Sequence, residues 1–90
     1  MPTVQFTRHL SRFFPTLVEC RINGDTVAAV VAELNRKHPG LADYLMDEHG
    51  ALRKHVNIFV GDQLICDREK LSDPVGPDDQ IFIMQALSGG

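Results

Sequence analysis

The sequence predicts a single α+β domain in which a mixed sheet of four to five strands packs on one main helix. Three segments alternate apolar and polar residues with the period of two that marks a half-buried strand, and a fourth is apolar on both faces. Another segment repeats apolar residues at the spacing of a helical face. The order strand, strand, helix, strand, short strand, strand fits a two-layer domain. A chain of 90 residues has room for one such core.

The first two strands are expected to form a hairpin. Residues 3–7 alternate, with Val4 and Phe6 on one face, and residues 16–22 alternate again. Because the loop between them, residues 8–15, is short, the pattern predicts antiparallel neighbours.

The main helix is expected to begin after Asn23-Gly24, a dipeptide typical of turns. Asp25 and Thr26 are both favourable N-cap residues. His38-Pro39-Gly40 ends the helix, because proline cannot continue it and disfavours helical backbone at the preceding residue. The buried face is the apolar stripe of Val27, Val30, Val31 and Leu34.

The segment after the main helix is expected to start with a short helix over residues 41–46, with Leu41 and Leu45 packed inward. Residues 47–54 are predicted to form an exposed loop. Residues 55–60 then form the third clear strand, whose alternate side chains face opposite sides of the sheet.

The last part of the sequence contains a short return strand at Leu64-Ile65, after the turn residues Gly61-Asp62. Residues 67–79 carry two prolines and five acidic residues, so we expect a loop with room for one helical turn. Residues 80–86 form the last strand, and its apolar residues on both faces predict a central position in the sheet.

One face of the sheet and the helix stripe form the expected core. A single helix leaves the opposite face uncovered, and Phe59, Phe82 and Met84 alternate onto that face. The sheet residues expected in the core are Val4, Phe6, Val18, Ile22, Val56, Ile58, Ile81 and Ile83.

Composition argues against several classes of function. A net charge of −3 with scattered basic residues disfavours nucleic-acid binding. No apolar run approaches the roughly 20 residues that cross a bilayer, and the N-terminus lacks the pattern of a secretory signal. Cys66 follows Ile65, and Cys20 alternates onto the same strand face as Val18 and Ile22. The two cysteines lack CxxC spacing, which favours reduced core cysteines in a cytoplasmic protein.

No pattern of catalytic or metal-ligating residues stands out. The glycine-rich phosphate loops and nucleophile motifs are absent, and a domain this small has little room for a catalytic cleft. We therefore expect no bound cofactor or metal. The four histidines lack metal-ligand spacing and are expected at the surface: His9, His38, His49 and His55.

The C-terminal segment carries the most distinctive feature of the sequence. The last expected strand leads through Leu87 and Ser88 into Gly89 and Gly90. Glycine has no Cβ, so the pair is as narrow as its backbone and can enter a tight cleft. We therefore expect a domain of residues 1–86 and a flexible tail of residues 87–90, which spans at most about 13–14 Å when extended.

Three stretches carry a resemblance to a known family: residues 24–27 at the start of the helix, residues 56–62, and residues 78–90 with the final diglycine. Together with the element order, they resemble the β-grasp (ubiquitin-like) fold of the MoaD/ThiS sulfur-carrier proteins. The resemblance covers nearly the whole chain. Leu45-Met46-Asp47 and the Val-Asn-Ile stretch look closest to MoaD-like carriers of amino-acid biosynthesis, such as the cysteine-pathway carrier, and the loop of residues 43–54 is longer than in the other carriers.

The resemblance implies that the chain is a carrier and co-substrate rather than an enzyme. A ubiquitin-activating-like adenylyltransferase would use ATP to turn the Gly90 carboxylate into an acyl-adenylate, and a sulfur donor would then leave a Gly90 thiocarboxylate. A sulfur-accepting biosynthetic enzyme, of the cysteine/methionine type or of a cofactor pathway, would take the sulfur. The residues expected to enter a partner's active site are Leu87, Ser88, Gly89 and Gly90, and those expected to dock partners are Phe59, Phe82 and Met84.

Two other functions remain open. A protein modifier would use the same activation and form isopeptide conjugates through Gly90, whereas a non-covalent interaction module would have no reactive tail. The expected docking residues also have an alternative, which is to pack against Phe13-Phe14, and Leu87 could fix the tail on its own domain. Deleting Gly90 separates the covalent functions from the non-covalent one.

Overall fold

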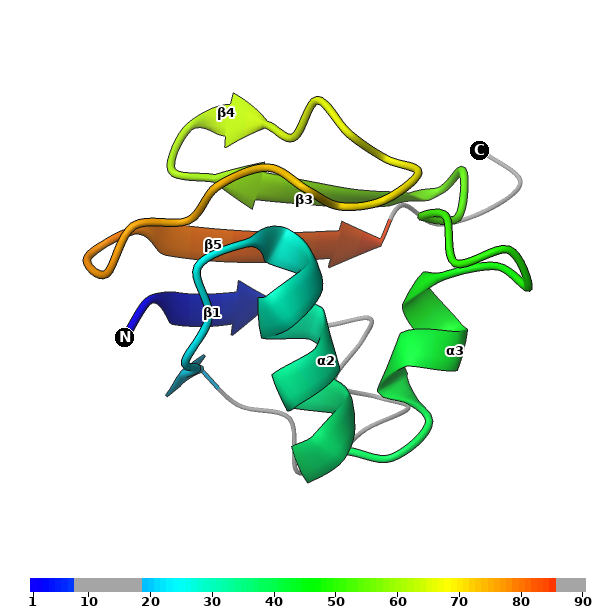
Figure 1. The fold of residues 1–90 in the computed structure, drawn as a ribbon, viewed down its shortest axis with the longest axis horizontal. Helices are drawn as coiled ribbons and strands as arrows, with labels where there is room; N and C mark the ends of the chain where they lie inside the picture. The colour runs from blue at the N-terminus through cyan, green and yellow to red at the C-terminus, as the bar shows by residue number, and fades with distance from the viewer. Residues whose placement is uncertain (8–18, 86–90) are drawn as a thin grey trace.

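The computed structural model describes residues 1–7 and 19–85. A five-stranded sheet forms one layer, and two helices pack on one of its faces (Figure 1). This is the predicted two-layer α+β architecture. The elements in chain order are β1 Thr3–Phe6, β2 Cys20–Arg21, α2 Val27–Lys37, α3 Leu41–Leu45, β3 Val56–Val60, β4 Gln63–Leu64 and β5 Gln80–Gln85.

Strand β5 lies at the centre of the sheet, whose strand order is β2-β1-β5-β3-β4. It pairs parallel with β1 and antiparallel with β3, so the sheet is mixed. The predicted hairpin pairs β1 with β2, and the short return strand β4 pairs with β3, both antiparallel. The central position of β5 agrees with its apolar residues on both faces.

Helix α2 begins and ends where its sequence signals predict. The Thr26 side chain accepts a hydrogen bond from the Ala29 N–H (3.1 Å), which satisfies one of the donors that a helix start leaves free. The chain returns near residues 71–73 to supply carbonyl acceptors for the N–H groups of Val27 (3.0 Å) and Ala28 (2.8 Å). The helix ends at Lys37, and His38 is its C-cap residue, just before the proline. Its buried residues are the predicted stripe, Val27, Val30, Val31 and Leu34.

The core lies between the helices and the inner face of the sheet. Leu41 and Leu45 of α3 join it, as predicted. Phe6 is half-buried and packs against the edge of the core, and Val18 lies outside the described residues. The sheet residues that are buried as predicted are Val4, Ile22, Val56, Ile58, Ile81 and Ile83.

The prediction that both cysteines are core residues is wrong for Cys66, which is exposed. Cys20 is half-buried and packs against the core. Ile65, next to Cys66, is buried, and the Cys66 N–H donates to Asp73 Oδ2 (2.9 Å) in the following loop. Because successive residues of an extended segment face opposite sides, an apolar neighbour does not predict that a side chain is buried.

The prediction of an exposed loop between α3 and β3 is wrong for Leu52, which is buried. Its backbone forms a bridge with Met46. The Asp47 carboxylate accepts hydrogen bonds from the N–H groups of His49 (2.8 Å) and Ala51 (3.1 Å), which holds the turn that brings Leu52 inward. Leu52 belongs to no repeating apolar pattern, so its burial could not be predicted from periodicity.

Within the described residues, no helix combines the length and the apolar character that crossing a membrane requires.

Candidate functional site: the outer face of the sheet

The outer face of the sheet, opposite the helices, carries a row of side chains aligned by strand register. Gln5 on β1 pairs with Phe82 on β5. Phe82 also pairs with Phe59 on β3, and Phe59 in turn pairs with Leu64 on β4. Directly paired residues share a face of the sheet, so these four side chains form one row across four strands. Met84 lies two residues beyond Phe82 on the same face. We call Phe59, Leu64, Phe82 and Met84 the outer-face patch.

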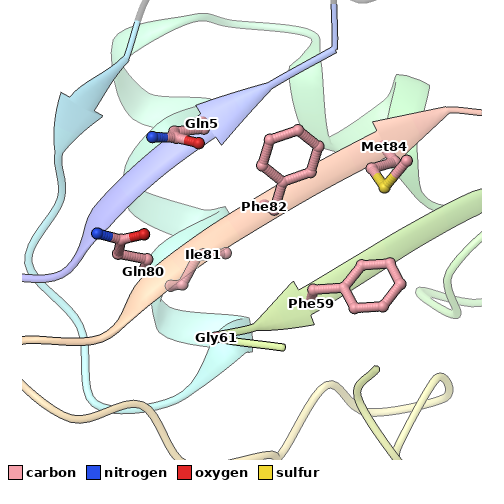
Figure 2. A pocket seen from close by; sticks show the side chains of 7 residues that line it. All are labelled: Gln5, Phe59, Gly61, Gln80, Ile81, Phe82 and Met84. Carbon is pink, nitrogen blue, oxygen red and sulfur yellow. The ribbon is translucent and has the colours of Figure 1, made fainter. Parts of the chain in front are cut away.

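A shallow hollow of about 230 Å³ lies over this face. Figure 2 shows the rings of Phe82 and Phe59 on neighbouring strands, with Met84 beyond them and the amides of Gln5 and Gln80 to the other side of Phe82. The hollow is therefore apolar at its centre. Its lining residues are Gln5, Phe59, Gly61, Gln80, Ile81, Phe82 and Met84.

The outer-face patch leaves apolar area in contact with solvent. Leu64 is 48% exposed and Met84 is 37% exposed, while Phe59 and Phe82 are half-buried. A contiguous apolar surface that includes a flexible methionine is typical of protein-binding sites. The expected placement of Phe59, Phe82 and Met84 on one open face is thus what the structure shows, and their docking role stays a prediction. The alternative partner Phe13-Phe14 lies outside the described residues.

Polar side chains border the patch on both sides. Towards β2, the Gln5 Nε2 group donates to Glu19 Oε1 (2.7 Å). Towards the start of β3, Asn57 pairs with Met84, and its Oδ1 accepts from Arg68 Nη1 (3.0 Å). An apolar centre with a polar rim is the usual anatomy of a protein interface.

The end of β5 fixes where the C-terminal segment leaves the sheet. Gln85, the last residue of β5, pairs with Val56, the first residue of β3. Because the two strands are antiparallel, β5 finishes at the end of the sheet at which β3 begins. Met84 is next to Gln85, so the outer-face patch reaches this end of the sheet. The expected tail residues lie outside the described residues: Leu87, Ser88, Gly89 and Gly90.

The shifted pKa values lie away from the outer face and have structural causes. The Ser72 hydroxyl and the Lys70 N–H hold the pKa of Asp67 at about 2. A hydrogen bond from Arg36 lowers the pKa of Glu33, and burial raises the pKa of the Cys20 thiol. Among residues 1–7 and 19–85, no group of three or more His, Cys, Asp or Glu side chains is placed to hold a metal ion.

The sequence and the fold both match known proteins. The ThiS family model matches residues 11–90. The sulfur carrier protein CysO of Mycobacterium tuberculosis is 33% identical over 70 residues, which cover 76% of this chain and 75% of that protein. The crystal structure of Mycobacterium tuberculosis CysO superposes with a TM-score of 0.83 at 27% identity, covering 97% of this chain and 100% of the other. A chain of the BexX/CysO complex of Amycolatopsis orientalis gives a TM-score of 0.85 at 23% identity with full coverage of both chains.

This protein therefore belongs to the ThiS family. The predicted β-grasp fold is confirmed by the superposed structures, and the predicted class of ubiquitin-like sulfur carriers is confirmed by the family match and by the similarity to CysO.

Residues that join the site through strand register could not be found from one strand's pattern alone. Alternation along one strand placed Phe59 and Met84, but Gln5, Leu64 and Arg68 join the site through pairing between strands and loops distant in sequence. The signal that could have found Leu64 is its position in the return strand, where a two-residue turn at residues 61–62 sets it opposite Phe59.

Proposed function

We propose that this protein carries sulfur as a thiocarboxylate on Gly90. A carboxylate is a poor electrophile, so a ubiquitin-activating-like adenylyltransferase first joins it to AMP, with release of pyrophosphate from ATP. A sulfur donor then displaces AMP from the acyl-adenylate. The resulting thiocarboxylate is acidic, and its ionised sulfur is a soft nucleophile at neutral pH.

The observation that carries this proposal is the family match, which extends through residue 90 and so includes the diglycine. The register of β5 supports it, because Gln85, the last described residue before the tail, lies beside Met84 of the outer-face patch at the end of the sheet where β3 begins. Glycine at the last two positions lets the segment enter a channel that admits little more than backbone.

The outer-face patch is the proposed docking surface for both partners, the activating enzyme and the sulfur acceptor. Two of its residues, Phe82 and Met84, lie on β5, the strand that precedes the tail, so a partner that covers the patch is positioned to receive residues 87–90. Two phenyl rings and two exposed aliphatic side chains supply the kind of contact that dominates protein interfaces. The partners bind ATP and catalyse the reactions, while this chain supplies the C-terminal carboxylate to which the sulfur is attached. Similarity to the sulfur carrier protein CysO supports an acceptor in biosynthesis of the cysteine type.

The test is the intact mass of the protein isolated from its own host, with fragmentation of its C-terminal peptide. We expect a species in which one oxygen of the Gly90 carboxylate is replaced by sulfur. The same spectrum shows which residue ends the mature chain. Brief isolation under reducing, neutral conditions limits hydrolysis of the thiocarboxylate back to the carboxylate.

A Gly90-deleted chain, produced in the same host, is the matched control and should carry no sulfur. Gly90 found in amide linkage to lysines of other proteins would replace the carrier with the modifier. Two results together would exclude both covalent functions. The wild-type chain would carry no sulfur, and the host's pathway would work equally well with the Gly90-deleted chain.

A further inference from the structure

The two ends of the β3–β5 pair carry opposite charge. Arg53 and Lys54 come just before β3, at the end of the sheet where β5 finishes, and Arg68 binds the same end of β3. At the other end, Asp62 follows β3 and Asp78-Asp79 precede β5. The whole chain has a net charge of −3, so the basic end departs from the average of the molecule. We call Arg53, Lys54 and Arg68 the basic end.

Arg68 is held by neutral acceptors only. Its Nη1 donates to Asn57 Oδ1 (3.0 Å), and its Nη2 donates to the carbonyl oxygens of Arg53 (2.7 Å) and Val56 (2.8 Å). The half-buried guanidinium is thereby fixed in position, but no described carboxylate neutralises it. A fixed, unpaired cation is a favourable site for an external anion.

Neither neighbouring basic side chain forms an ion pair among the described residues. A nearby carboxylate is that of Asp47, whose pKa is lowered mainly by the His49 N–H and to a smaller extent by the Arg53 charge. The Arg53 guanidinium donates from Nε (3.3 Å) and Nη2 (3.0 Å) to the carbonyl oxygen of Asp43, which is again a neutral acceptor. Lys54 is exposed. Within residues 1–7 and 19–85, the ion pairs join Arg36 to Glu33 and His49 to Glu48, so none involves the basic end.

The basic end adjoins the base of the C-terminal segment. Val56, whose carbonyl Arg68 binds, pairs with Gln85, the last residue of β5. Figure 1 shows the end of β5 and the segment that joins α3 to β3 at the same end of the sheet. The five residues 86–90 span at most about 17–18 Å when extended. The basic end therefore lies at the base of this segment and not at Gly90, the residue that would carry the sulfur.

We propose that the basic end docks against a carboxylate-rich surface at the mouth of the activating enzyme's channel. This inference rests on the proposed function, in which the tail enters that channel. The outer-face patch supplies apolar contact area, and the basic end orients the carrier so that its tail meets the channel. Charge complementarity of this kind raises the rate of association more than the affinity, and salt weakens it.

The experiment compares two double variants of equal charge change. Arg53→Glu/Lys54→Glu reverses the exposed part of the basic end and leaves Arg68 and its hydrogen bonds to Asn57 and Val56 in place. Arg21→Glu/Lys37→Glu makes the same change at two exposed basic residues away from the base of the tail, on β2 at the far edge of the sheet and at the end of α2. Each purified protein is added to extract of the host supplied with ATP and a sulfur source. The initial rate at which it gains sulfur is followed by intact mass at low and at high salt.

At low salt we expect the Arg53→Glu/Lys54→Glu protein to gain sulfur about tenfold more slowly than wild type, and the control to match wild type. High salt should reduce the difference in rate between this variant and wild type, because it slows the gain of sulfur by the wild type. Arg53→Lys, which keeps the charge, should behave as wild type. Thermal unfolding followed by circular dichroism confirms that every variant is folded.

Equal rates for the two double variants, or a gap that salt leaves unchanged, would overturn the inference while the carrier function stands. A wild-type chain that gains no sulfur, in extract and in the host, would instead overturn the proposed function and this inference with it.

Discussion

Asp67 organises the loop between β4 and β5 through its carboxylate. The carboxylate accepts hydrogen bonds from the Ser72 hydroxyl and from backbone N–H groups, including that of Lys70 (2.9 Å). These donors favour the ionised form, which holds the pKa of Asp67 at about 2. The ordered loop then presents the carbonyl of Leu71 to the first turn of α2, so one side chain links a surface loop to the start of the main helix.

The low pKa of Asp67 predicts a pH-dependent contribution to stability. The unfolded carboxyl has a pKa of about 3.9, above the folded value, so its contribution is complete above about pH 4 and is lost as the pH falls towards 2. We expect Asp67→Asn to unfold at lower urea concentration than wild type at pH 7, and the difference to shrink between pH 4 and pH 2. Urea titrations at these pH values measure it.

Asp62→Asn, at the exposed turn between β3 and β4, is the control for removal of a surface carboxylate and should leave the urea midpoint nearly unchanged. A difference between Asp67→Asn and wild type that stays constant from pH 7 to pH 2 would show that the carboxylate charge is not what orders the loop.

Among the elements, α2 depends on its N-cap. The Thr26 hydroxyl is the side-chain acceptor for the Ala29 N–H, and Thr26 has the extended backbone of a cap residue. We expect Thr26→Ala to lower the free energy of unfolding by about 1 kcal/mol, because the Ala29 N–H loses its acceptor. Chemical denaturation followed by circular dichroism measures the change. Thr26→Ser keeps the hydroxyl and should stay close to wild type; equal losses in both variants would point to the Thr26 methyl group instead.

Elements with a clear period could be predicted from the sequence, and isolated residues could not. The apolar stripe from Val27 to Leu34 and the proline after His38 predicted the extent of α2. A buried helical face and a helix end each have a local sequence pattern. Leu52 and Cys66 were misassigned because neither belongs to a repeating pattern. Hydrogen bonds to the Asp47 and Asp73 carboxylates hold the chain next to Leu52 and Cys66. Such hydrogen bonds cannot be identified from a single sequence.

The candidate site likewise has one part that could be predicted from the sequence and one part that could not. Alternation along β3 and β5 predicted that Phe59, Phe82 and Met84 share a face, since this follows from the period of a strand. The contact between Arg68 and Asn57 at the polar border of the patch could not be predicted, because it joins a loop residue to a strand residue 11 positions away in the sequence. Strand register and loop closure are properties of the folded chain, and they assemble the border of the patch from residues far apart in sequence.

At the scale of the whole molecule, the two faces of one sheet differ in burial, so the proposed docking surface is separate from the core. The inner face holds the domain together, with Ile81 and Ile83 enclosed beneath the helices. The outer face, on the same strand, leaves Met84 in contact with solvent. A carrier that meets several partners needs a surface whose residues can be substituted without loss of stability. A sheet with one covered face has such a surface, because successive residues of a strand point to opposite faces.

This separation predicts opposite behaviour for two adjacent residues of β5. Ile83→Ala removes a fully buried side chain and should lower the free energy of unfolding by about 2–5 kcal/mol. The protein that remains folded should still gain sulfur at the wild-type rate when measured below its unfolding transition. Met84→Ala removes an exposed side chain and should change stability by less than about 1 kcal/mol, yet slow sulfur loading about fivefold or more, as expected where a side chain contributes more than about 1 kcal/mol to binding. Denaturation curves and intact-mass loading rates on both variants measure the two effects. If Met84→Ala and Phe82→Ala both load at the wild-type rate, the partners dock on another surface, and the apolar outer face serves the fold alone.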